Sequence, residues 1–259
     1  MTPSLVVPGV VSAAVGLLVG SALTSVIERV PAKLSLLRPG PRCPGCSAPL
    51  TLVDSVPVLS WAVLRGRCRH CARSIGTRYP AVEALTAALF VGVVVRFGEH
   101  PVILAYWLFA ATLVAVSAID LEHRIVPNRI IYPVLGISVP LLVALALADG
   151  APVALARAAI GGAAAFAVLF LIHLIQPQGM GFGDVRLAGL IGVYLGWLSL
   201  GDVAAGLVLG FVLAAVVGIG LMAGGKAGRR SRVAFAPFLA LGAMVAVYWG
   251  PQILALWKR

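Results

Sequence analysis

Two aspartates stand at the edges of long apolar runs, and they are the first residues whose type and position suggest chemistry. Asp184 closes the Gly-Phe-Gly-Asp stretch at residues 181–184, which separates two apolar runs, and Asp120 ends another apolar run and opens the short polar segment Asp-Leu-Glu-His-Arg at residues 120–124. An ionisable group at the end of a membrane-embedded run is costly unless it faces a polar interior, so each aspartate is a candidate functional residue. We predict that the two side chains meet in space.

A pair of neighbouring carboxyl groups has a recognisable chemistry. Two carboxylates a few ångströms apart cannot both ionise easily, so the pair holds one proton between them. One group can then activate a water while the other protonates a carbonyl oxygen, which suits peptide-bond hydrolysis without a metal or a nucleophilic side chain. The alternative is that a lone aspartate at the end of a span caps a helix or lies at the interface.

Two glycines precede Asp184 and have a physical role in this hypothesis. Gly181 and Gly183 would let the backbone unwind or approach a neighbour closely, and non-helical backbone at membrane depth is tolerated where it lines a wet cavity. Asp184 would then lie in the first turn of its helix, where the helix dipole favours an anion. The alternative for a glycine cluster is an ordinary turn.

The four cysteines form a second constellation, with the spacing of two C-x2-C pairs: Cys43, Cys46, Cys68 and Cys71. The 21 residues between the pairs slightly exceed the usual zinc window of about 15–20, but four thiolates suit a closed tetrahedral zinc site. Zinc would fold a segment too small to build its own core. The alternative to a zinc site is a set of free or redox-active thiols. His70 is a further candidate ligand that would replace one cysteine in the zinc site; the other interpretation is a solvated histidine in the loop.

The chain that must position these residues has the composition of a membrane protein. It has 259 residues, of which 61% are hydrophobic and 11% charged, against about 45–50% and about 25% in a soluble domain. Apolar runs near the length of about 20 residues that spans a bilayer occur eight times, at residues 5–27, 81–97, 102–119, 130–148, 153–175, 185–200, 203–223 and 233–257. The first is expected to be a retained span, because it lacks the basic start and the short apolar region of a cleaved signal.

The expected fold is an all-α polytopic membrane protein, with about eight transmembrane helices and a small cytoplasmic zinc-binding loop domain. Its domains would be a first transmembrane helix at residues 1–27, the tetracysteine domain at residues 28–80, and a transmembrane domain with both aspartates at residues 81–259. The sixth span is the least secure because it is short and rich in glycine. Prolines in the segment 28–79 predict turns rather than helix there.

The basic residues predict the orientation. The net charge is +11, and with eight spans the Lys and Arg residues divide sixteen to four between the two sides of the membrane. The positive-inside rule then places both termini outside and the cysteine segment in the cytoplasm, where disulfides are not expected. Because the basic residues lie in short loops between apolar runs, with no aromatic-interleaved basic domain, nucleic acid is not an expected partner.

The chain resembles the type IV prepilin peptidases, which are membrane aspartyl proteases with a GxGD motif. Gly181–Asp184 matches their second catalytic motif, and Asp120 followed by Pro127-Asn128 looks like the first. The resemblance extends to residues 20–31, to the tetracysteine region with Asp54, Trp61 and Glu83, and to the Ala-Pro-Phe-Leu-Ala stretch at residues 236–240. It departs from the family at Ala22 and Thr24, where Phe and Asn are usual, and at Ala236, where Gly is common.

The resemblance implies a function. Asp120 and Asp184 would be the catalytic acids, supported by Gly181 and Gly183, of an endopeptidase that removes the short basic leader from prepilin and pseudopilin precursors at the cytoplasmic membrane face. The cysteines would hold zinc. Family members with the cysteine domain are often also N-methyltransferases that use S-adenosylmethionine, for which the sequence carries no independent signal.

Two rival hypotheses use the same residues. A proton-coupled transporter would also bury acids beside helices broken by glycine, but it predicts an inverted repeat, which the sequence does not have. A non-catalytic assembly protein would recruit partners through the zinc loop and tolerate changes at both aspartates. Glu122 is the alternative partner of Asp184, Glu83 is expected to favour a helix dipole, and His173 is expected to be packed or interfacial, with a cavity residue as the alternative.

Overall fold

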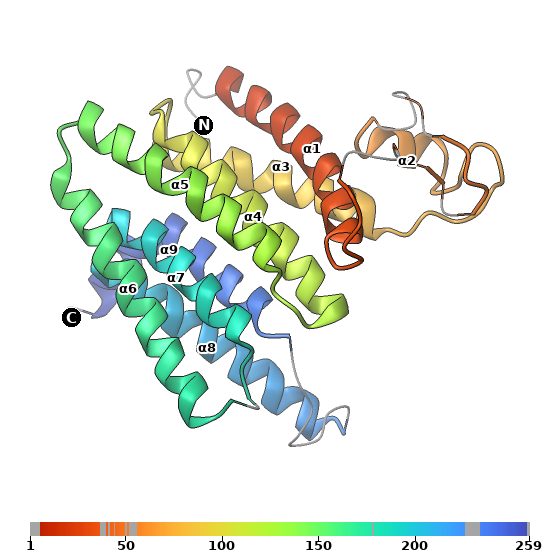
Figure 1. Ribbon diagram of the computed structural model, residues 1–259. Helices are drawn as coiled ribbons and strands as arrows, with labels where there is room; N and C mark the ends of the chain where they lie inside the picture. Colours follow the sequence, from red (N-terminus) through yellow and green to blue (C-terminus); the bar gives the residue numbers. More distant parts are fainter. Residues whose placement is uncertain are drawn as a thin grey trace. The chain divides into compact units, whose positions relative to one another are not determined.

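The computed structural model describes residues 6–36, 40, 42–43, 45–49, 51, 56–177, 179–225 and 234–257. Within these ranges the chain is helical, with two isolated β-bridges in the cysteine segment and no strand, which confirms the predicted all-α class. Figure 1 shows long helices, with a long segment that contains α2 between α1 and α3. The helices are α1 (Val6–Arg29), α2 (Leu59–Val63), α3 (Arg78–Phe97), α4 (Val102–His123), α5 (Asn128–Ala148), α6 (Pro152–Ile175), α7 (Phe182–Leu198), α8 (Leu200–Ala223) and α9 (Ala236–Trp257).

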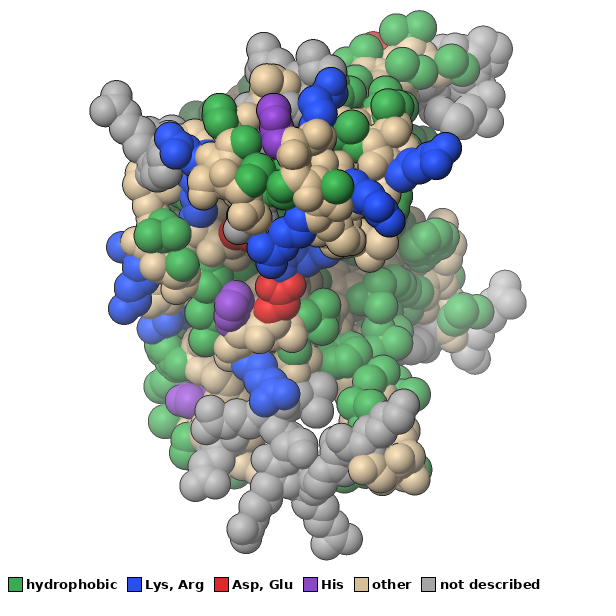
Figure 2. Space-filling model, turned by 90° about the vertical axis from the view of Figure 1, so that its right-hand side faces the viewer, with side chains coloured by type: hydrophobic (Ala, Val, Ile, Leu, Met, Phe, Trp, Pro, Cys, Tyr) green, Lys and Arg blue, Asp and Glu red, His purple; other side chains and the backbone are tan. Residues whose placement is uncertain are grey.

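Seven of these helices are long and apolar enough to cross a membrane: α1, α3, α4, α5, α6, α8 and α9. Many of their large hydrophobic side chains are exposed, and Figure 2 shows such side chains on the outer surface, as expected where lipid takes the place of water. The chain is therefore a multi-pass membrane protein.

The predicted sixth span corresponds to α7, which is shorter than the others. It has 17 residues, or about 26 Å at the helical rise of about 1.5 Å per residue, a little less than the hydrocarbon thickness of about 30 Å. Most of its side chains are buried, including Val185, Leu190 and Tyr194. A helix that is apolar on all sides and buried on all sides belongs to a core, so α7 is the central helix of its bundle.

The chain forms two compact units, Met1–Ile103 and Leu104–Arg259. The predicted domain borders at residues 27 and 80 differ from this division and stay a prediction. In the first unit α1 packs closely against α3, because a Cβ on Gly16 or Gly20 would lie 2.6 Å from a backbone atom of α3. Small residues allow this approach between membrane helices.

In the second unit α7 packs against α6, α8 and α9, and a buried polar network ties it to α4 and α5. The hydroxyl of Tyr106 on α4 donates to the carbonyl oxygen of Tyr194 on α7 at 2.8 Å, and the hydroxyls of Tyr194 and of Ser138 on α5 share a hydrogen bond of 2.6 Å. All three residues are buried. Because buried polar groups need specific partners, this network sets the register between the helices that carry the two aspartates.

Candidate active site and metal centre

Asp184 lies in the first turn of α7, as the sequence predicts. Its Oδ2 accepts a hydrogen bond of 3.2 Å from the backbone N–H of Gly181, and its own N–H donates to the carbonyl oxygen of Gly181 at 3.0 Å. This reach back to an N–H before the helix is half of a capping box. The residue is 7% exposed, and its Oδ1 is buried with no hydrogen-bond partner among the residues described.

Asp120 lies in the last turns of α4, which continues to His123, four residues beyond the predicted end of the span at residue 119. It is 5% exposed. Its Oδ2 accepts a hydrogen bond of 3.0 Å from the N–H of Ala236, the first residue of α9. The first N–H groups of a helix have no partner inside the helix, so Asp120 satisfies one of them and gains from the dipole of α9.

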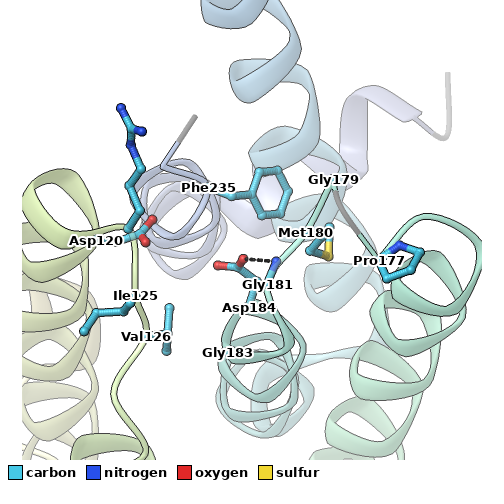
Figure 3. A pocket seen from close by; sticks show the side chains of 11 residues that line it. Asp120, Ile125, Val126, Pro177, Gly179, Met180, Gly181, Gly183, Asp184 and Phe235 are labelled. Atoms are coloured by element: carbon cyan, nitrogen blue, oxygen red, sulfur yellow. Dashed lines mark hydrogen bonds between the residues drawn. The ribbon is translucent and has the colours of Figure 1, made fainter. Parts of the chain in front are cut away.

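The two aspartates line one pocket of about 280 Å³, together with Arg124, Ile125, Val126, Pro177, Gly179, Met180, Gly181, Gly183 and Phe235. Figure 3 shows the carboxyl groups of Asp120 and Asp184 on opposite sides of this pocket, pointing toward one another. Each is held through its Oδ2 by a backbone N–H at the start of a helix. The two acids are therefore fixed in position and face a shared space.

Gly183 lies against the loop between α4 and α5. A Cβ added to it would lie 2.7 Å from the Cβ of Val126 and 3.1 Å from the carbonyl oxygen of Val126. Gly181 differs, because it has φ −72° and ψ 144° and a Cβ there would meet its nearest neighbour, Oδ2 of Asp184, at 3.4 Å. The close approach of the first turn of α7 to the α4–α5 loop thus depends on Gly183, whereas the conformation of Gly181 is open to other residues.

Replacing Gly183 by Ala is expected to lower the free energy of unfolding by about 1–3 kcal/mol, the usual cost of overpacking a tight contact, and to lower activity by moving the start of α7, which carries Asp184, away from the loop that follows Asp120. Thermal unfolding in detergent and a peptidase assay measure the two effects. Gly218→Ala on α8 is the matched control, because nothing lies within 4 Å of a Cβ at that position. Equal behaviour of the two variants would contradict this role of Gly183.

The α6–α7 connection is held by a histidine whose partner the sequence does not indicate. His173 on α6 is half-buried, and its Nδ1 lies 2.9 Å from the carbonyl oxygen of Met180. A carbonyl only accepts, so Nδ1 carries the proton and donates. The ring also packs against Phe182, at 5.6 Å between centroids. His173 therefore positions the segment just before Asp184, and it does not line the pocket.

Asn128 and Arg186 connect the other side of α7 to α5. Nη1 of Arg186 donates to Oδ1 of Asn128 at 2.5 Å, and its guanidinium group lies over the ring of Phe182 at 4.3 Å. In the sequence Asn128 is part of a motif, and Arg186 is one of the basic residues that predict the orientation. A contact between positions 58 apart has no local signal that could have revealed it.

The other acids noted in the sequence lie elsewhere. Glu122 is 40% exposed in its side chain, lies 3.9 Å from His123 and does not line the pocket, so the geometry gives no support to it as the partner of Asp184. Glu83 is buried, and its Oε2 accepts a hydrogen bond of 2.7 Å from the N–H of Val58. The sequence predicts only a favourable interaction of Glu83 with a helix dipole and does not indicate this hydrogen bond to the cysteine segment.

The four cysteines meet in the first unit. Their Sγ atoms all lie within 4.8 Å of one another, and none forms a disulfide. In the first hairpin the N–H of Cys43 donates to the carbonyl of Ala48, and the N–H of Ser47 donates to the carbonyl of Cys43, both at 2.9 Å; the second hairpin repeats both bonds around Cys68. Each C-x2-C pair is therefore a tight turn that presents two sulfurs to the same point.

The cluster fits a metal ion such as zinc. Zinc–thiolate bonds of about 2.3 Å in a tetrahedron put sulfurs about 3.8 Å apart, and Sγ of Cys43 and Sγ of Cys71 lie 3.8 Å apart. The N–H groups of Gly45 and Cys46 lower the pKa of Cys43 to about 6. The N–H of Arg73 lowers the pKa of Cys71, but desolvation and the three neighbouring thiols raise it to about 11. Four thiolates this close need a cation to hold them together.

Two family models match the chain. Residues 14–97 match the model described as the bacterial peptidase A24 N-terminal domain, which covers the cysteine segment, and residues 107–223 match the model described as the type IV leader peptidase family, which covers both aspartates.

Relatives match over nearly the whole length. The prepilin leader peptidase/N-methyltransferase of Aeromonas hydrophila is 34% identical over 268 residues, covering 92% of this chain and 89% of its own. The protein of the same name from Bacillus subtilis is 32% identical and covers 94% and 95%, and that from Myxococcus xanthus is 38% identical and covers 83% and 64%. No solved structure matches the chain significantly.

Proposed function

Because the chain belongs to the type IV leader peptidase family and is a peptidase, we propose that it removes the leader peptide from type IV prepilin and pseudopilin precursors, with Asp120 and Asp184 as its catalytic acids. The observation that carries the proposal is that these two buried carboxyl groups face one another across a single pocket. The match to the type IV leader peptidase family and the name of the relatives support a prepilin-type substrate.

In the proposed mechanism the two aspartates share one proton and hold a water between them. The ionised carboxylate takes a proton from this water as the water oxygen attacks the carbonyl carbon, and the protonated acid donates its proton to the carbonyl oxygen. The resulting diol collapses as one hydroxyl returns its proton to a carboxylate. The C–N bond then breaks, and the leaving amine takes a proton from the acid.

The positions of the carboxyl oxygens support this division of labour. Oδ2 of each aspartate is occupied by a backbone N–H, which fixes the carboxyl planes before substrate arrives. Oδ1 of Asp184 is buried and has no partner among the described residues, so it lacks the hydrogen bond that a bound water or a substrate would supply. Preorganised groups need no rearrangement when the reaction begins, which is how fixed dipoles lower a barrier.

We further propose that cleavage takes place at the cytoplasmic face of a bacterial inner membrane, with both termini outside. Asp120 lies near the end of α4 and Asp184 in the first turn of α7. Two spans, α5 and α6, separate them, so both acids belong to the side on which the positive-inside rule collects sixteen of the twenty Lys and Arg residues. The same rule puts the cysteine segment in the cytoplasm, where thiols remain reduced.

Cys43, Cys46, Cys68 and Cys71 would hold a structural zinc ion, which when bound would cross-link the two hairpins. Four protein ligands leave no open position for catalysis. N-methylation of the new N-terminus with S-adenosylmethionine is proposed only from the names of the relatives, and no residue of this chain is assigned to the methyl donor.

Mass spectrometry of the N-terminus of a co-expressed prepilin tests the proposed function. We expect the precursor to lose its leader and, if the second activity is present, to gain 14 mass units, the mass of one CH2 group, on the new terminal residue. Cells with an empty vector are the control for background processing. A precursor that keeps its leader, with the enzyme present and folded in the membrane, would refute prepilin cleavage.

A further inference from the structure

Helix α2 of the cysteine segment carries an exposed apolar face although it lies outside the membrane-spanning helices. Leu59 and Val63 are 64% and 79% exposed, and their spacing of four residues puts them on the same side of the helix. Trp61 faces the other way, because its Nε1 donates to the carbonyl oxygen of Ile75 at 3.0 Å. The hydrogen bond of Trp61 thereby fixes the orientation of α2, and the side with Leu59 and Val63 is left exposed.

The start of α2 is bonded to a membrane-spanning helix. The N–H of Val58 donates to Oε2 of Glu83 at 2.7 Å, and Glu83 lies five residues into the candidate span Arg78–Phe97. Five residues correspond to about 7.5 Å along the helix axis. The hydrogen bond therefore holds the start of α2 beside the second turn of α3, near one end of a candidate membrane span, and the ends of such spans lie at the bilayer interface.

The backbone at this junction needs such a partner. Val58 has φ 59°, in the left-handed region that a β-branched residue rarely adopts. Glu83 is itself 8% exposed, and its Oε2 accepts the hydrogen bond from Val58. A residue in an unfavourable conformation persists only where its surroundings hold it, and Glu83 is a neighbour that does so.

Cationic side chains follow the apolar face directly. Arg65 and Arg67 come two and four residues after α2, and both are exposed. On the face that Figure 2 presents, Lys and Arg side chains are mixed with apolar ones. Apolar residues beside arginines, next to the end of a candidate membrane span, have the composition of a segment that lies in the interface of an anionic bilayer.

We propose that α2 is an interfacial membrane anchor: Leu59 and Val63 enter the boundary between headgroups and acyl chains, Arg65 and Arg67 bind anionic headgroups, and Glu83 sets the depth. The occupant of this face is lipid. The anchor would hold the cysteine hairpins flat on the membrane instead of leaving them on a free tether between α1 and α3. It does not depend on the peptidase mechanism or on which side of the membrane the segment lies.

Bromolipid quenching in the full-length protein tests the anchor. An environment-sensitive fluorescent amino acid is incorporated at position 63, and the protein is reconstituted into phosphatidylglycerol/phosphatidylcholine vesicles whose acyl chains carry bromine near the glycerol. The matched control has the same probe at position 70, because His70 is exposed on the second cysteine hairpin. We expect blue-shifted, bromine-quenched emission at position 63 and neither effect at position 70.

Two results would overturn the proposal. Blue-shifted emission without quenching at position 63 would mean that protein covers the face, and red-shifted emission without quenching would mean that water does. Further variants test the contributions of the arginines and of Glu83. The double variant Arg65→Gln, Arg67→Gln is expected to weaken the quenching at position 63, and so is Glu83→Leu. Glu83→Gln keeps an acceptor for the N–H of Val58 and is expected to retain the quenching. Unchanged quenching in Glu83→Leu would remove Glu83 from the anchor.

Discussion

Replacing Asp184 by Asn is expected to lower the rate of prepilin cleavage by about 10²–10⁴-fold, the usual contribution of a positioned acid or base, while the protein stays folded. The amide has the same shape as the carboxyl group, and its oxygen can still accept the hydrogen bond from the N–H of Gly181. The variant therefore keeps the start of α7 and loses only the ability to exchange a proton.

Asp120→Asn is expected to have an effect of the same size for the same reason, because its amide oxygen can still accept from the N–H of Ala236. The double variant is expected to be little worse than either single one, since residues that act as a unit are not additive. Single-turnover cleavage of a purified prepilin in detergent measures all three, and circular dichroism with thermal unfolding verifies the fold.

Glu122→Gln is the control for a change of charge at the same helix end. Glu122 is two positions from Asp120 and half-exposed beside His123, so its replacement is expected to leave cleavage unchanged. Near-full activity in either aspartate variant would rule out the acid pair. A loss in Glu122→Gln together with activity in Asp120→Asn would instead assign the second acid to Glu122.

The sequence predicts the membrane helices well because their signal is local. Runs of apolar residues must be long enough to cross the bilayer, and every predicted span corresponds to a helix of the structure, with ends that differ by a few residues. The largest difference between a predicted span and its helix is at the C-terminal end of α4. The sequence ends the span at residue 119, whereas the helix continues to His123, because hydrogen bonding along a helix does not stop where the apolar residues do.

What holds the two aspartates in place could not be predicted, because it depends on contacts between distant positions. Nothing near Asp120 indicates that its partner is the N–H of Ala236, 116 residues away. Nothing near Gly183 indicates that it faces Val126. The sequence can mark which groups need a partner, an acid in an apolar run or a glycine before a helix, but the choice of partner is made by helix packing.

The choice between the functional hypotheses also needs more than the sequence pattern. The transporter and the peptidase hypotheses use the same buried acids, and spacing alone does not distinguish them. The family matches do, because they identify a peptidase. The roles of Asp120 and Asp184 within that peptidase stay a prediction, which the asparagine variants above address.

Removal of the metal is the second large effect that we expect. The purified protein should contain about one zinc ion per chain, and Cys43→Ser should lose it. Apparent binding free energies of structural zinc are about 10–16 kcal/mol at neutral pH, far more than a small turn-rich segment gains from its own core. The cysteine hairpins should therefore unfold without the ion. Elemental analysis measures the metal, and limited proteolysis should show new cleavage between residues 28 and 79 only.

His70→Ala is the matched control for this prediction, because His70 is exposed between two ligands and is not one of the clustered residues. This variant should keep the zinc.

Zinc binding should also release protons, since the pKa values of Cys43 and Cys71, about 6 and about 11, leave part of the cluster protonated at neutral pH. Protons compete with the ion for the same sulfurs, so the affinity for zinc should fall as the pH is lowered. The fall should be steepest once the pH is below the pKa of Cys43, about 6. A metal-free protein whose hairpins resist protease as well as the wild type does would show that the thiols have another use.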